Sequence, residues 1–88
     1  MNVSVKDLEN KAKSIEKQLK ENGFNCKIGD YSHNGMYEYV LDFYPVGKPQ
    51  DGLHRQLCTE LGTKKEVFYS FDTIYYKALE NKEFYTKF

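Results

Sequence analysis

Two histidines and two cysteines are the residues of this sequence best suited to metal binding or nucleophilic catalysis. His54 and Cys58 stand four residues apart in "GLHRQLCTELG", residues 52–62, while Cys26 and His33 stand seven apart. A structural zinc site needs four ligands that converge in tetrahedral geometry. On an extended strand rising about 3.3 Å per residue, Cys26 and His33 would lie roughly 20 Å apart, too far to share one ion. The spacing therefore predicts no metal site and no cofactor.

A cysteine–histidine nucleophile pair is the second chemistry that these residues could support. Such a pair needs an exposed thiol with a lowered pKa and a third group that orients the imidazole. Asp51 precedes His54 by three residues, but we expect Cys58 on the buried face of a helix, where cysteine behaves as a small hydrophobe. The chain also lacks a nucleophile elbow, a phosphate-binding loop and a dinucleotide fingerprint. We therefore expect no catalytic residues and no enzymatic activity.

The composition indicates one small globular domain, residues 1–88, with hydrophobic residues at 40% and aromatics at 16% to build its core. Thirteen basic and thirteen acidic residues leave no net charge, whereas proteins that follow a nucleic-acid backbone usually carry a basic excess. The N-terminus has no long apolar run, so we expect no signal peptide, no membrane span and a cytoplasmic location. Lysine dominates over a single arginine, which is typical of an AT-rich genome such as that of a low-GC bacterium or its phage.

The elements that would position these side chains begin with an amphipathic helix. Apolar residues recur at steps of three and four from position 5 to position 19, namely Val5, Leu8, Ala12, Ile15 and Leu19. Ser4 is expected to cap the helix, with Asp7 in its first turn. Gly23 suits the left-handed residue that ends a helix, and Phe24 suits the apolar residue that follows it.

Asn34 and Gly35 between two alternating runs form the strongest short-range signal for a β-hairpin. A turn at these two residues pairs apolar with apolar residues and opposite charges with each other. The predicted pairs are Ile28 with Leu41, Cys26 with Phe43, Lys27 with Asp42, and Tyr31 with Glu38. One face of the hairpin then belongs to the core and carries Phe24, Cys26, Ile28, Tyr39, Leu41 and Phe43. The other face carries Lys27, Tyr31, Val40, Asp42 and Tyr44.

The second half of the chain gives weaker signals. We expect a helix over residues 51–61, with His54, Leu57, Cys58 and Leu61 on its buried stripe, and a strand in the alternating aromatic run 66–73. The tail is expected to form a helix capped by Asp72, although a hairpin turning at Asn81 and Lys82 is the alternative. The fold class is therefore α+β in the order αββαβα, with αββαββ as the alternative.

Eight tyrosines in 88 residues direct the functional prediction toward binding. We expect Tyr31, Tyr44, Val40, Lys27 and Asp42 to form a contact surface for another protein or for a second copy in a homodimer, because tyrosine is enriched at interface cores. A helix covering this face, which would make the tyrosines core residues, is one alternative. Stacking of nucleic-acid bases on the tyrosines is another. The prediction is a non-enzymatic binding module, either an accessory protein or a phage- or plasmid-borne modulator of a host protein.

Overall fold

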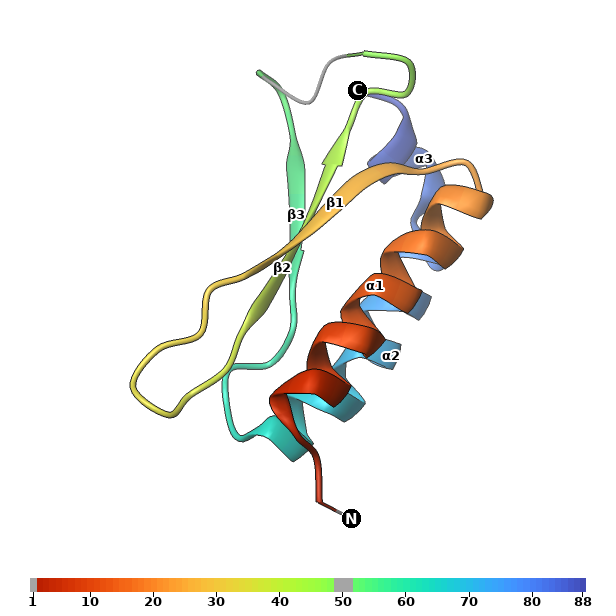
Figure 1. The fold of residues 1–88 in the computed structure, drawn as a ribbon. Helices are drawn as coiled ribbons and strands as arrows, with labels where there is room; N and C mark the ends of the chain where they lie inside the picture. The colour runs from red at the N-terminus through yellow and green to blue at the C-terminus, as the bar shows by residue number, and fades with distance from the viewer. Residues whose placement is uncertain (1, 49–51) are drawn as a thin grey trace.

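The computed structural model describes residues 2–48 and 52–88 and confirms the α+β class. Its three strands form one antiparallel sheet in which they lie side by side in the order of the sequence, and the helices lie on one side of that sheet (Figure 1). Within these residues, no helix is both long enough and apolar enough to cross a membrane. The elements are α1 (Val5–Glu21), β1 (Asn25–Asp30), β2 (Tyr39–Tyr44), β3 (Arg55–Cys58), α2 (Lys64–Glu80) and α3 (Lys82–Thr86).

Helix α1 begins and ends at the residues that the sequence predicts. The Ser4 hydroxyl accepts a hydrogen bond from the Asp7 amide at 3.1 Å, and the Asp7 carboxylate accepts one from the Ser4 amide at 2.9 Å. This capping box satisfies two amides that a helix start leaves unpaired. At the other end Gly23 takes φ = +90°, and the Phe24 amide donates to the Leu19 carbonyl at 3.0 Å. The apolar stripe of α1, which lies between these two ends, faces the core, and all of it except the half-exposed Val5 is buried.

The hairpin register is also confirmed. Asn34 and Gly35 both take positive φ, at 52° and 76°, as a type I′ turn requires, and His33 bridges to Met36 across them. The four predicted cross-strand pairs are all present, three of them in the β1–β2 ladder and the fourth through the hydrogen bond from the Tyr31 amide to the Glu38 carbonyl.

The helix predicted over residues 51–61 is wrong, because this segment contains the strand β3. Asp51, its predicted first residue, lies outside the described residues. β3 pairs antiparallel with β2, and Leu57 lies opposite Leu41. Of the stripe expected to be buried, only Leu57 is buried, whereas Leu61 is 52% exposed and His54 and Cys58 are exposed as well. Pairing with the free edge of β2 gives this short segment the backbone hydrogen bonds that an isolated helix of such length would hold only weakly.

The strand predicted at residues 66–73 is wrong as well, since these residues form the first half of α2. Thr63 caps the helix, and its capping box with Glu66 matches the one that starts α1. The buried face follows helical spacing through Val67, Ser70, Phe71, Ile74 and Ala78. Aromatic residues favour strands only weakly, so the capping box and the continuous apolar stripe decide the conformation.

The helical tail is confirmed in part, because Asp72 is an interior residue of α2 rather than the cap of a separate helix. Asn81 ends α2 and starts α3, so the alternative hairpin at this position is wrong. The order of elements is αβββαα, which replaces both αββαβα and αββαββ.

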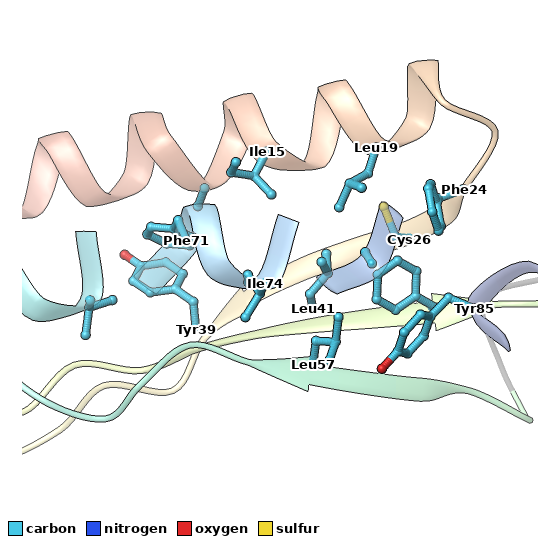
Figure 2. Close-up of a cluster of buried hydrophobic side chains, with 14 of the residues drawn as sticks. Ile15, Leu19, Phe24, Cys26, Tyr39, Leu41, Leu57, Phe71, Ile74 and Tyr85 are labelled. Carbon is cyan, nitrogen blue, oxygen red and sulfur yellow. The ribbon is translucent and has the colours of Figure 1, made fainter. Parts of the chain in front are cut away.

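The core lies between the two long helices and the inner face of the sheet, where Figure 2 shows its larger side chains. Five of the six residues predicted for the core face of the hairpin are buried there, and the sixth, Ile28, is partly buried against them. The rings of Phe43 and Tyr85 lie 4.6 Å apart between centroids, so α3 closes one end of the core.

Arg55 fastens α3 to the sheet. Its Nη1 donates hydrogen bonds to the carbonyl oxygens of Phe84 and Lys87. The guanidinium carbon also lies 4.2 Å from the ring centroid of Phe84 and 4.3 Å from that of Phe88. This single arginine therefore pairs with the C-terminal carbonyls of α3 and with two aromatic rings at once.

Candidate functional site

The candidate site is the outer face of the sheet, which is the face directed away from the helices (Figure 1). Side chains alternate across a strand, so the predicted register places a defined set of residues on this face. It brings together all five residues that the sequence assigned to a contact surface, Lys27, Tyr31, Val40, Asp42 and Tyr44. β3 adds Gln56 and Cys58, because Gln56 lies opposite Asp42 and Cys58 opposite Val40. His54, which directly precedes β3, also reaches this face, with its Nε2 near Asp42.

Three apolar side chains on the outer face differ in their exposure. Tyr31 is 58% exposed, whereas Tyr44 is 9% and Val40 6% exposed, although neither belongs to the core cluster under the helices. Of the two tyrosines predicted for the contact surface, Tyr31 is therefore exposed and Tyr44 is buried. The ring of Tyr31 folds over Gly29, where an added Cβ would lie 3.3 Å from it, and Gly29 is the cross-strand partner of Val40.

Asp42 is the polar centre of the outer face. Its Oδ1 accepts a hydrogen bond from Gln56 Nε2 at 2.6 Å and lies 4.0 Å from His54 Nε2. The His54 ring in turn lies 6.0 Å from the Tyr44 ring between centroids. Burial, with a smaller effect of the Asp42 charge, raises the pKa of Tyr44. The outer face thus combines an exposed aromatic ring with hydrogen-bonding groups that are already ordered.

Cys58 does not lie on a buried helix face, as the sequence suggested, but is exposed on the outer face. His54 lies on the same face four residues earlier, which on a strand corresponds to about 13 Å. Partial burial and the nearby carboxylates of Glu38 and Asp42 raise the pKa of the Cys58 thiol, opposite to what a catalytic nucleophile needs. His54 and Cys58 therefore do not form a nucleophile–base pair.

Of the two cysteines, Cys26 is the buried one, and it packs in the core between α1 and β1. Burial and the charge of Glu16 raise its pKa to about 12. Over residues 2–48 and 52–88, no group of three or more His, Cys, Asp or Glu side chains is placed to hold a metal ion.

The place of His54, Gln56 and Cys58 on the outer face differs from the prediction, which puts these residues in a helix. Their alternation with the inward residues Leu57 and Thr59, both buried, was the available signal. That signal is short, and the i, i+4 spacing of His54 and Cys58 obscured it.

Comparison of the chain with protein-family models, with curated proteins and with solved structures finds no match.

Proposed function

We propose that this protein is a non-enzymatic protein-binding module and that the outer face of its sheet is the contact surface. One observation carries the proposal. The helices pack on one side of the sheet (Figure 1), and the opposite side carries both an exposed aromatic ring, that of Tyr31, and an ordered polar group, the hydrogen-bonded Asp42. Protein interfaces combine these features, with aromatic anchors at the centre and polar groups able to pair around them.

The charges on the outer face favour a protein partner over a nucleic acid. Lys27 lies opposite Asp42, and Glu38 lies on the same face beside the Tyr31 backbone. A surface that stacks bases needs basic groups for the adjoining phosphates. The two carboxylates would repel phosphates there, while a protein surface can pair with both signs of charge.

The role that we propose for such a module is that of an accessory protein, or of a modulator of a host protein encoded by a phage or plasmid. The lysine-rich, arginine-poor composition supports an AT-rich origin of this kind.

The experiment that tests the outer face compares capture of partners by the protein and by Tyr31→Glu. Tyr76→Glu is the matched control, because Tyr76 is 60% exposed on α2 and Tyr31 58% exposed on the sheet. After nuclease treatment of the cell extract, we expect the protein and the control to retain the same partner and Tyr31→Glu to lose it. Equal retention by all three would contradict the proposal, as would binding that disappears with nuclease or moderate salt.

Stability measurements separate the two tyrosines of the outer face. Tyr31→Ala is expected to leave the melting temperature nearly unchanged, because exposed side chains contribute little to folding. Tyr44→Ala is expected to lower the free energy of unfolding by on the order of 2 kcal/mol, because it removes a buried aromatic ring. Binding studies should therefore vary Tyr31 alone.

A further inference from the structure

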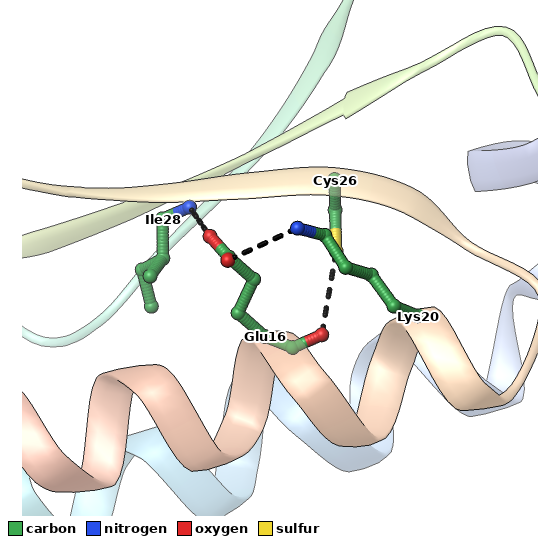
Figure 3. A network of polar contacts seen from close by, with 4 residues as sticks. All are labelled: Glu16, Lys20, Cys26 and Ile28. Carbon is green, nitrogen blue, oxygen red and sulfur yellow. Dashed lines mark hydrogen bonds and ion pairs between the residues drawn. The ribbon is translucent and has the colours of Figure 1, made fainter.

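The two edges of the sheet are protected differently, and β1 is blocked at one of its outward amides. The Ile28 amide points away from β2 and donates a hydrogen bond to Glu16 Oε1 on α1 at 2.7 Å (Figure 3). Lys20 holds the same carboxylate at 3.2 Å. A side chain that occupies an edge amide blocks the pairing of another strand at that point.

The edge of β3 is open. The Thr59 amide donates to the Tyr39 carbonyl at 2.9 Å, so the backbone groups of Arg55, Leu57 and Thr59 face β2. In an antiparallel ladder the residues between them face the other way. These are Gln56 and Cys58, and within the part of the chain that the structure describes, no hydrogen bond occupies their backbone N–H and C=O groups. β3 therefore presents four unpaired backbone groups to a further strand.

A groove of about 620 Å³ lies between this open edge and α2. Leu57 and Ile74 give it an apolar base, and both are buried. Thr73 and the half-exposed ring of Tyr69 line it from the helix side. A strand added to β3 would direct every second side chain into this groove, and the exposed ring of Tyr69 could contact those side chains.

The charges at the two ends of the groove are opposite. Glu60 and Glu66 lie at one end, where the Glu60 amide donates to the Ser70 hydroxyl at 2.6 Å. Lys77 lies further along α2, toward the end at which Arg55 holds α3. A strand antiparallel to β3 starts beside Glu60 and finishes beside Lys77. The complementary segment carries a basic residue near its N-terminal end and an acidic residue near its C-terminal end.

A second copy of the chain fits the groove less well than such a segment. In that second copy, the inward side chain of β3, Leu57, is already buried in the core of the same copy, and Arg55 is already bound to the α3 of the same copy. Neither side chain is free to enter the groove of a partner. The groove therefore suits a strand whose inward side chains are uncommitted.

We propose that an extended segment of another protein adds antiparallel to β3 and places alternate side chains in the groove against α2, with a basic residue beside Glu60. Main-chain hydrogen bonds would supply affinity, and the groove would supply selectivity. The proposal rests on the protein-binding function and names a class of partner for it. The two fail separately, because Tyr31→Glu alters the outer face and leaves the β3 edge intact.

The test uses a library of random linear twelve-residue peptides selected on the immobilised full-length protein. Enriched peptides are synthesised and measured against Gln56→Pro and Gln56→Ala. Proline at this position removes the outward amide without removing a bond to β2, and alanine is the control for loss of the side chain. We expect binding to Gln56→Pro to be at least about tenfold weaker than binding to Gln56→Ala, because both variants lose the side chain that donates to Asp42 and only proline also removes the outward backbone N–H.

Further readouts keep the proposal falsifiable if Gln56→Pro does not fold. Thr73→Trp fills the groove from the helix and should also weaken binding, and bound peptide should slow amide exchange at Gln56 and Cys58. Lys77→Glu should weaken peptides that end in an acidic residue. Failure to enrich any peptide, equal binding by Thr73→Trp, or a homodimer that exists only while the β3 edge is intact would overturn the proposal.

Discussion

At the scale of single residues, the two cysteines show how position on the sheet sets reactivity. Cys26 points into the core and is fully buried, with its pKa raised to about 12. Cys58 points to the outer face and is exposed, although partial burial and two neighbouring carboxylates raise its pKa as well. Because the thiolate is the reactive form, Cys58 is accessible but is expected to react slowly. Cys26 is inaccessible to reagents in the folded protein.

Thiol labelling is therefore expected to modify one cysteine in the folded protein and two after unfolding. At pH 8 the native reaction should be slower than that of free cysteine, because a raised pKa lowers the fraction of thiolate at a given pH. The measurement is the time course of modification with a chromogenic disulfide reagent. Cys58→Ser provides the control and should show no native labelling, and rapid native labelling of this variant would contradict the burial of Cys26.

At the scale of elements, α3 has only five residues and depends on its docking to the sheet. Tyr85 anchors it in the core, and Arg55 binds its terminal carbonyls while its guanidinium lies over the rings of Phe84 and Phe88. A planar guanidinium can donate to two carbonyls and stack on rings at the same time, which an ammonium cannot do. The identity of residue 55 therefore matters beyond its charge.

Arg55→Lys is expected to lower the free energy of unfolding by about 1 to 2 kcal/mol, because it loses one hydrogen bond and the stacking on two rings. Denaturant unfolding measures the loss, and faster amide exchange at Tyr85 and Lys87 should locate it in α3. Lys48→Arg, which exchanges the same two residue types at an exposed site, should leave both readouts unchanged. An Arg55→Lys protein as stable as the original would show that charge alone holds α3.

At the scale of the whole molecule, the fold buries one cysteine thiol and several tyrosine hydroxyls and thereby favours their protonated forms. Burial raises the pKa of Cys26, and also that of Tyr39, Tyr44 and Tyr85. Each of these groups would ionise at a lower pH in the unfolded chain than in the folded one. Above the unfolded pKa, the unfolded chain binds fewer protons, so ionisation favours unfolding.

The contribution of these groups to the free energy of unfolding is therefore expected to stay constant up to about pH 9 and to fall as the pH rises toward 12. Urea midpoints at pH 7, 9 and 10.5 measure this dependence. Cys26→Val is expected to be less sensitive between pH 9 and 10.5, whatever its stability at pH 7, because it removes one such ionisation. Equal sensitivity of the two proteins would mean that the Cys26 thiol is solvated in the folded state.

The hairpin and α1 could be predicted because their signals are local. Asn34 and Gly35 are residues that accept the positive φ of a type I′ turn, and a fixed turn sets every pair in a ladder of period two. The capping box of Thr63 and Glu66 carried an equally local signal for the start of α2. The wrong prediction of a strand at residues 66–73 rests on the aromatic run that follows this capping box.

The sequence by itself determined α1, the hairpin and the membership of Tyr31, Val40 and Asp42 in one face, since each depends on neighbours within about ten residues. The tertiary structure alone decided that residues 55–58 form a strand, because this conformation depends on the free edge of β2. It also decided that Tyr44 is buried, that Cys58 is exposed and that a groove opens beside β3. These properties depend on which elements pack against which side of the sheet, and that choice is made by long-range contacts that local spacing does not encode.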